Sequence, residues 1–246
     1  MIEIIGHRGA RFEAPENTLE GFRHALALGL TTVEFDVHTT ADGELVVIHD
    51  ATVDRTTDGT GTVNRLTLAE IKSLDASSVH CLWPKPVRVP TLAEVLETLR
   101  EMPNMEIEIK TDSPERLDHV VPRVIEHIRS FDRGAGTYIT SFDPYAIELA
   151  QRLAPEIQRG FIGDYSLEPT WYLAKQFQVS KVGINLRHAT PHLVERAKSA
   201  GYRTAGWPCN DEDAVRKVKA CGFDEVCTDA PSLFAPMFGK RLNRPD

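Results

Sequence analysis

The residues best suited to chemistry lie in two short segments in which acidic side chains alternate with apolar ones. The first segment is Val33-Glu34-Phe35-Asp36-Val37-His38, and the second is Met105-Glu106-Ile107-Glu108-Ile109-Lys110. If both segments are β-strands, alternation places the apolar residues on one face and the carboxylates on the other. Glu34, Asp36 and Glu108 would then gather on one side of a sheet, where unpaired carboxylates are costly unless a cation neutralises them.

These carboxylates have two interpretations. Ligation by oxygen alone suits a hard divalent cation such as Mg²⁺ or Ca²⁺, since softer metals recruit cysteine or several histidines. We therefore predict a metal site formed by Glu34, Asp36 and Glu108. The alternative is a structural network in which glutamate and lysine side chains neutralise one another.

Two histidines follow short apolar runs close to these segments. His7 closes the run that begins at Ile2, and His49 follows the run from Leu45 to Ile48. A single histidine at a strand end is often structural, but histidine is also the side chain best matched to proton transfer near neutral pH. Because two of them accompany a carboxylate cluster, we predict His7 and His49 as catalytic residues.

The elements that must position these residues form a regular alternation of short β-like runs and helix-like segments, which indicates a parallel sheet covered by helices. The predicted strands are Ile2–Ile5, Val33–Val37, Met105–Ile109, Thr137–Thr140, Ile157–Ile162, Lys181–Asn185, Thr204–Trp207 and Glu225–Thr228. Eight such runs in 246 residues are typical of a (β/α)8 TIM barrel built as one domain. Active sites of such barrels lie at the C-terminal ends of the strands.

Several helix ends are also predicted from local chemistry. Capping pairs spaced three residues apart predict helix starts at Asn17, Thr91 and Asn210. Glycines that follow apolar periodic stretches predict helix ends at Gly29, Gly201 and Gly222.

Residues 51–88 interrupt the alternation, because they hold a segment rich in threonine, glycine and aspartate and two closely spaced prolines. We predict a small insertion after the second strand that lies over the mouth of the barrel. It either helps to form a ligand pocket or is a surface excursion.

Composition and charge exclude several classes of function. The net charge of −8, with no dense lysine and arginine cluster, argues against a nucleic-acid surface. No apolar run is long enough to span a bilayer, and Met1 leads into an apolar run without the pattern of a secretion signal.

The sequence has four cysteines and no CxxC pair, so we expect the cysteines to be packing residues in a reduced, cytoplasmic protein. These cysteines are Cys81, Cys209, Cys221 and Cys227. Oligomeric state is not specified.

The ordered set of motifs resembles the glycerophosphodiester phosphodiesterases, a family of phosphatidylinositol-phospholipase-C-like barrels. The resemblance covers nearly the whole chain and rests on the order and spacing of many segments. They are His7-Arg8-Gly9-Ala10, Pro15-Glu16-Asn17-Thr18, Glu34-Phe35-Asp36-Val37, Thr40-Ala41-Asp42-Gly43, Val46-Val47-Ile48-His49-Asp50, Asp54-Arg55-Thr56-Thr57-Asp58-Gly59, Leu74-Asp75-Ala76, Val89-Pro90-Thr91-Leu92, Glu106-Ile107-Glu108-Ile109-Lys110, Ser141-Phe142 and Thr228-Asp229-Ala230-Pro231.

The resemblance implies metal-dependent hydrolysis of a small glycerophosphodiester to glycerol 3-phosphate and an alcohol. Its catalytic acid and base would be His7 and His49, its metal ligands Glu34, Asp36 and Glu108, and its phosphate-binding residues Arg8 and Lys110. The chain departs from the family pattern around Trp207 and in residues 77–83. Trp207 would either form an apolar wall beside the glycerol or fill the barrel.

Two other functions are compatible with the sequence. The first is a phosphodiesterase of the lysophospholipase D type, in which Leu82 and Trp83 of the insertion receive an acyl chain. The second is a barrel that binds phosphodiesters without catalysis, which the retained histidines and carboxylates disfavour.

Overall fold

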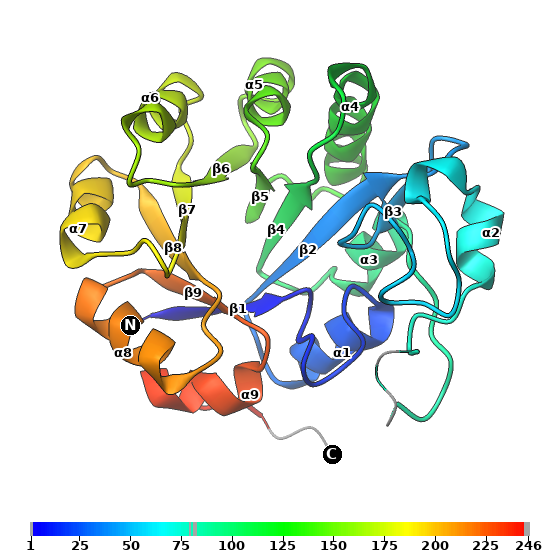
Figure 1. Ribbon diagram of the computed structural model, residues 1–246, viewed down its shortest axis with the longest axis horizontal. Helices are drawn as coiled ribbons and strands as arrows, with labels where there is room; N and C mark the ends of the chain where they lie inside the picture. The colour runs from blue at the N-terminus through cyan, green and yellow to red at the C-terminus, as the bar shows by residue number, and fades with distance from the viewer. Residues whose placement is uncertain (1, 79, 81–82, 244–246) are drawn as a thin grey trace.

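Eight parallel strands form a closed barrel in the computed structural model, which describes residues 2–78, 80 and 83–243 (Figure 1). In spatial order the strands are β1 (Glu3–His7), β2 (Thr32–Thr39), β4 (Asn104–Ile109), β5 (Thr137–Ser141), β6 (Gln158–Gly163), β7 (Lys181–Asn185), β8 (Arg203–Trp207) and β9 (Glu225–Thr228). Parallel pairing of β9 with β1 and of β1 with β2 closes the barrel. The predicted fold and all eight predicted strands are confirmed.

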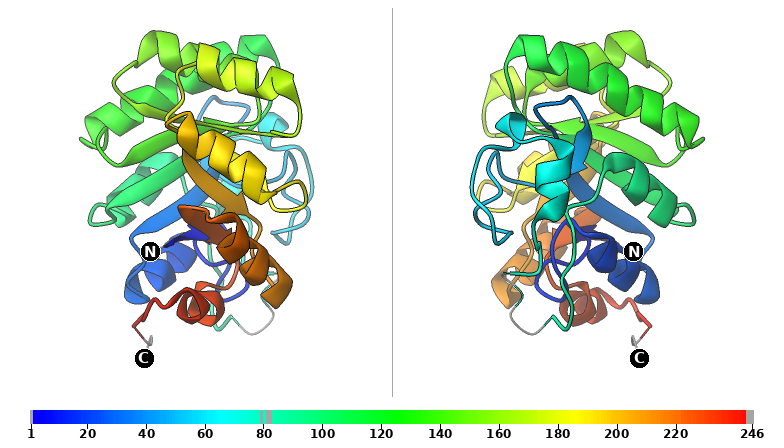
Figure 2. Two further views of the ribbon diagram at one scale, coloured as in Figure 1. Left: turned by 90° about the vertical axis from the view of Figure 1, so that its left-hand side faces the viewer. Right: turned by 90° about the vertical axis from the view of Figure 1, so that its right-hand side faces the viewer.

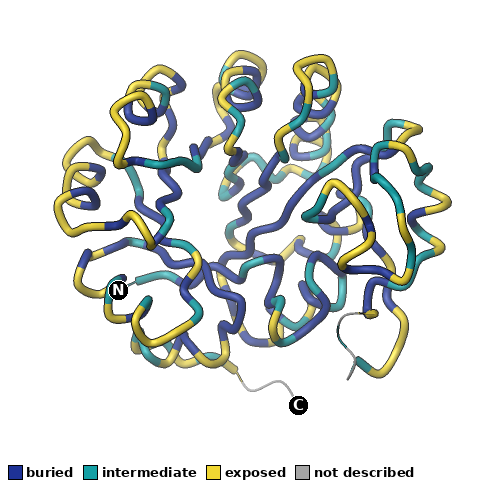
Figure 3. Tube along the Cα trace, in the orientation of Figure 1, coloured by how far each residue is buried: buried dark blue, intermediate teal, exposed yellow. Residues whose placement is uncertain are grey.

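Helices cover the outside of the barrel, and exposed residues lie on their outer faces and in the loops between elements (Figures 2 and 3). They are α1 (Leu19–Ala27), α3 (Leu92–Thr98), α4 (Pro114–Ser130), α5 (Pro144–Leu153), α6 (Glu168–Gln176), α7 (Pro191–Ser199), α8 (Glu212–Cys221), α9 (Pro231–Phe234) and the 3-10 helix η2 (Ala235–Phe238). Among the described residues, none of these helices is long and apolar enough to cross a lipid bilayer.

Strand alternation explains how the sequence divides β2 between the core and the barrel interior. Val33, Phe35 and Val37 are buried in the main hydrophobic core, where the Phe35 ring lies 5.5 Å from that of Phe22 on α1. Glu34 and Asp36 occupy the alternate positions and are also buried. The apolar face therefore packs against helices, and the carboxylates project into the barrel, as predicted.

The helix ends follow the predictions only in part. Thr91 begins α3 with a full capping box to Glu94, and Gly29, Gly201 and Gly222 all have positive φ angles at helix ends. The other two predicted starts are wrong by one residue, since Thr18 caps α1 and Asp211 caps α8. The preceding asparagines, Asn17 and Asn210, instead bind carboxylates of the site described below.

Residues 51–88 carry the short helices η1 (Val63–Arg65) and α2 (Leu68–Ser73). They follow β3 (Leu45–Val47), which pairs antiparallel with the end of β2. This segment and β3 bury a second, smaller hydrophobic cluster, which includes Val46, Ile48, Val53, Val63, Ile71, Ala76, Val87 and Val89. The segment touches the loop after β1, because the His80 imidazole lies 3.1 Å from the Arg11 carbonyl oxygen. Cys81 and Leu82 lie outside the described residues.

Candidate active site

A cavity of about 290 Å³ opens at the C-terminal end of the barrel strands. Seven of the eight predicted site residues line it, namely His7, Arg8, Glu34, His49, Glu108, Lys110 and Trp207. The eighth, Asp36, is buried beside them, 1% exposed. The structure therefore brings together residues from β1, β2, β4, β8 and the loop after β3 that are far apart in the sequence.

Three carboxylates gather at the polar side of this cavity. Glu34, Asp36 and Glu108 each offer an oxygen atom, and these atoms lie within 4.8 Å of one another. The Oε1 atom of Glu34 is buried and has no hydrogen-bond partner in the part of the chain that the structure describes. A buried carboxylate oxygen without a donor is costly, and a divalent cation would satisfy it. The three residues thus fit a hard metal ion.

The pKa values of the three carboxyl groups also indicate that their negative charges are not fully compensated. Burial, followed by the charges of Asp36 and Glu108, raises the pKa of Glu34 well above its usual range. Burial and then the charge of Asp36 raise the pKa of Glu108 to about 7. Burial also opposes ionisation of Asp36, but the charges of Lys110 and Arg8 outweigh it and lower the Asp36 pKa. The site thus holds more carboxylates than its two basic side chains stabilise as anions.

The two basic side chains already contact the carboxylates. Lys110 Nζ lies 2.6 Å from Glu108 Oε1 and 3.1 Å from Asp36 Oδ1. Arg8 Nε lies 3.4 Å from Asp36 Oδ2, and its Nη1 donates to Glu16 Oε1 at 2.8 Å. Both cations line the cavity, so they can also meet an anionic ligand there.

His7 is held by a buried carboxylate on the neighbouring strand end. Its Nδ1 donates a short hydrogen bond to Oδ1 of Asp229, which directly follows β9 and is fully buried. Asp229 Oδ2 accepts from Asn210 Nδ2 at 2.6 Å and lies 2.8 Å from Arg11 Nε. This arrangement fixes the ring and leaves Nε2 facing the cavity, as in other histidines that transfer protons.

His49 has a similar arrangement that is closer to solvent. Its Nδ1 lies 2.6 Å from Asp50 Oδ1, and Asp50 Oδ2 accepts from Arg55 Nε at 2.6 Å. Arg55 also donates to Glu16, which binds Arg8, so one chain of ion pairs joins residues 51–88 to the loop after β1. Burial is the largest cause that lowers the His49 pKa.

The opposite wall of the cavity is apolar. Trp207, at the end of β8, packs edge-on against Phe142 with ring centroids 5.5 Å apart. Its indole Nε1 is buried and has no hydrogen-bond partner among the described residues. The other apolar residues on this side include Ile5, Ile162, Ala205 and Pro208. Trp207 therefore lines the cavity rather than only filling the barrel.

Sequence reasoning missed the residues that support the histidines and Asp36. The sequence indicates no role for Asp229, Glu16 and Arg55, although Asp229 directly follows a barrel strand, where site residues are expected. It predicts Asn17 and Asn210 as helix caps, yet Asn17 Nδ2 donates to Asp36 Oδ2 at 2.8 Å and Asn210 Nδ2 donates to Asp229 Oδ2 at 2.6 Å.

Comparisons with known proteins identify the family of the chain. The model of the glycerophosphoryl diester phosphodiesterase family matches residues 7–233. A glycerophosphodiester phosphodiesterase from Caldanaerobacter subterraneus is 35% identical over 96% of this chain and 98% of its own length. These matches confirm the predicted resemblance and enzyme class.

Two solved structures have the same fold over nearly the whole chain. One is a phosphodiesterase from Oleispira antarctica in complex with the product sn-glycerol-3-phosphate, with a TM-score of 0.90, 28% identity and 97% coverage of both chains. The other is a glycerophosphodiester phosphodiesterase from Agrobacterium tumefaciens, with a TM-score of 0.81, 32% identity and coverage of 96% of this chain and 100% of that one.

Proposed function

Because the chain belongs to the glycerophosphoryl diester phosphodiesterase family, we propose that it hydrolyses glycerophosphodiesters to glycerol 3-phosphate and an alcohol. The observation that carries this proposal is the convergence of His7 and His49, each bound to an aspartate, on a cavity beside three buried carboxylates. The product bound to the similar phosphodiesterase from Oleispira antarctica supports the same reaction class.

Glu34, Asp36 and Glu108 would hold a divalent cation, and their oxygen-only donor set favours Mg²⁺ or Ca²⁺. When bound, such an ion polarises phosphoryl oxygens and offsets the charge of the carboxylates. With one divalent cation, three carboxylates, Arg8 and Lys110, the site keeps a single positive charge. That charge matches a monoanionic phosphodiester.

The two histidines carry out the proton transfers. His7 Nε2 removes the proton of the glycerol 2-hydroxyl, whose oxygen bonds to phosphorus while the bond to the leaving oxygen breaks. His49, nearer to solvent, donates a proton to that leaving oxygen. Because burial lowers the His49 pKa, the protonated form that this step requires is stabilised by Asp50 and by the negative charge of the substrate.

The second half of the reaction reverses these roles. His49 removes a proton from water, the water oxygen opens the cyclic phosphate, and His7 returns its proton to the glycerol 2-oxygen. Direct attack by water is the alternative route, and resemblance to the phosphatidylinositol-phospholipase-C-like superfamily favours the cyclic one. Single-turnover product analysis distinguishes them, since only the first route forms a cyclic phosphate.

The remaining cavity residues bind the substrate. Arg8 and Lys110 contact the phosphate, and Trp207 with Phe142 forms a wall beside the glycerol or the alcohol. We also propose that residues 51–88 act as an insertion of a single domain, in which Arg55 fixes Asp50 and Glu16 at the mouth. The free cysteines Cys209, Cys221 and Cys227 support a reducing, cytoplasmic location.

The direct test is release of glycerol 3-phosphate from glycerophosphocholine and glycerophosphoethanolamine. We expect release with Mg²⁺ or Ca²⁺, loss with EDTA, and loss in His49→Ala. His192→Ala is the matched control, because His192 lies exposed on α7. Folded protein that releases no product with any metal would contradict the proposal.

A lysophospholipid substrate is the second candidate, and the structure gives it less support. Trp83, one of the two residues predicted to receive an acyl chain, packs against the small cluster formed by residues 51–88 and β3. Higher rates on lysophospholipids than on their deacylated head groups would reverse this ranking.

A further inference from the structure

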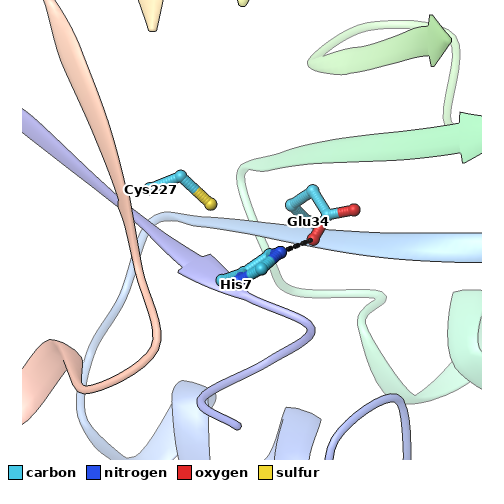
Figure 4. A group of neighbouring side chains, drawn as sticks. All are labelled: His7, Glu34 and Cys227. Carbon is cyan, nitrogen blue, oxygen red and sulfur yellow. Dashed lines mark ion pairs between the residues drawn. The ribbon is translucent and has the colours of Figure 1, made fainter. Parts of the chain in front are cut away.

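A second group of donor atoms lies beside the three carboxylates and shares one member with them. Side chains of His7, Glu34 and Cys227 converge from β1, β2 and β9, which are adjacent in the barrel (Figure 4). One nitrogen, one oxygen and one sulfur atom from these residues lie within 4.8 Å of one another. Neither Asp36 nor Glu108 belongs to this group.

His7 is oriented as a metal ligand would be. Because Nδ1 donates to Asp229, the neutral ring presents the lone pair of Nε2 to Glu34 Oε2, 3.8 Å away. Two electron-rich atoms face each other there, and a cation between them would turn repulsion into attraction. Histidines that bind metals usually donate their other ring N–H to a carboxylate or carbonyl group, as His7 does.

Glu34 and Cys227 supply the other two donors. The Glu34 side chain is buried, and its Oε2 faces His7 and accepts from the Arg8 backbone N–H at 3.2 Å. Its Oε1 has no partner among the described residues, so Glu34 can offer one oxygen to this site and the other to the three-carboxylate site. Cys227 is a free cysteine, also buried, on the side of the cavity next to His7. A mixed nitrogen, oxygen and sulfur set selects Zn²⁺ over Mg²⁺ and Ca²⁺, because a thiolate is a soft ligand.

We propose that His7, Glu34 and Cys227 form a second cation site that binds Zn²⁺ and, when filled, inhibits the enzyme. Ligand distances to Zn²⁺ are about 2.0–2.3 Å, so small rotations of these side chains would close the site. Three protein ligands leave one coordination position open, which suits a reversible ion rather than a structural one. Inhibition rests on the proposed function, because the ion occupies the nitrogen with which His7 transfers protons.

Cobalt binding tests the site without reference to activity. Co²⁺ replaces Zn²⁺ in such sites, and coordination by a thiolate produces a charge-transfer band in the near ultraviolet. We expect this band in the wild-type protein and in Cys221→Ser, which removes a thiol on α8 away from the cavity. We expect no band in Cys227→Ala or Cys227→Ser.

Either of two spectra would overturn the proposal. One is a wild-type protein that shows no band at saturating Co²⁺, a result that needs no variant to fold. The other is a band that persists in folded Cys227→Ala, which would place the thiolate ligand elsewhere.

Inhibition is measured separately, in buffered Zn²⁺ with Mg²⁺ in excess, and each variant is compared with its own rate without Zn²⁺. The Zn²⁺ concentration that halves the rate should rise by about tenfold or more in Cys227→Ala and stay unchanged in Cys221→Ser. Equal inhibition of wild type and Cys227→Ala would refute the inhibitory role, even if Co²⁺ binds as expected. If no hydrolysis is found at all, the proposed function fails and the cobalt spectra still decide the site.

Discussion

The barrel encloses two clusters of buried acids, and they differ in how their charges are compensated. In the first, Glu106 and Glu225 share Lys181, whose Nζ lies 2.6 Å from Glu106 Oε1 and 2.5 Å from Glu225 Oε2. Arg203 adds a second ion pair, at 2.6 Å from Glu225 Oε1. In the second cluster, Oε1 of Glu34 has no partner among the described residues.

The contrast separates a structural network from a functional site that occupies alternate positions of the same strand. Glu106 and Glu108 both project inward from β4, two residues apart. Burial raises the pKa of both. Each cluster has a buried carboxylate oxygen without a hydrogen bond among the described residues, Glu225 Oε2 in the first and Glu34 Oε1 in the second. Glu225 Oε2 still has the Lys181 ammonium group 2.5 Å away, whereas Glu34 Oε1 has no ion-pair partner in the described part of the chain. Of the two interpretations open at the sequence level, the glutamate–lysine network describes Glu106, and we propose that the metal site describes Glu108.

The largest effect is expected from substitutions on β4 that test this contrast. Glu108→Gln should lower kcat/KM by roughly 10³- to 10⁴-fold, because a bound divalent cation contributes several kcal/mol to the transition state. Glu106→Gln, the matched change two residues away, should stay within about tenfold, since Lys181 keeps Glu225 as a partner. Glycerol 3-phosphate release at saturating Mg²⁺ measures both, and equal losses would undo the distinction.

The structural cluster should instead determine stability. Lys181→Met leaves the buried carboxylate of Glu106 without its cation and Glu225 with Arg203 alone, so the free energy of unfolding should fall by about 3–5 kcal/mol. Denaturant titration measures this loss, which should be the same in EDTA and in Mg²⁺.

Lys110→Met is the comparison. Its loss of unfolding free energy should be smaller when Mg²⁺ is present, because the metal replaces the missing charge beside Asp36 and Glu108. An equal loss with and without Mg²⁺ would contradict the assignment of the metal site to this cluster.

The next largest effect on activity is expected at Asp229, which holds His7 in place. Asp229→Asn keeps the size of the side chain but removes the negative charge at Nδ1 of His7, so kcat should fall by roughly 10²- to 10³-fold. KM should change little, because Asp229 does not line the cavity. Steady-state kinetics separate the two parameters, and an effect confined to KM would argue against a positioning role.

The smallest effect concerns the apolar wall. Trp207→Leu removes the ring that packs on Phe142, and we expect KM to rise by about tenfold with a smaller change in kcat. Rates on two substrates that differ only in the alcohol show which part of the substrate the wall contacts. An unchanged KM for both would remove Trp207 from the binding residues.

The sequence was sufficient for the barrel and for the residues that project into it. Strand periodicity placed Glu34, Asp36 and Glu108 on the interior face, because a period of two leaves only one arrangement once Val33, Phe35 and Val37 pack on helices. Position at the end of a barrel strand was enough to place His7 at the mouth. His49 follows β3, which pairs antiparallel with β2 outside the eight barrel strands, so that rule alone does not place it.

The supporting residues could not be predicted, because their roles depend on contacts between distant segments. Asn17 and Asn210 look like helix caps in the sequence, and each lies one residue before the true cap. Only the closed barrel brings Asn17 to Asp36 and Asn210 to Asp229. Likewise, nothing local in the sequence links Arg55 to Glu16, 39 residues away.

The central claim is that the cluster of Glu34, Asp36 and Glu108 binds the divalent cation that hydrolysis requires. Calorimetric titration of Mg²⁺ and of Ca²⁺ into chelator-treated protein tests it most directly, with wild type, Glu108→Gln and Glu106→Gln compared side by side. We predict one binding site in wild type and in Glu106→Gln, and loss of that site in Glu108→Gln. Binding that survives in folded Glu108→Gln but disappears in Glu106→Gln would contradict the account.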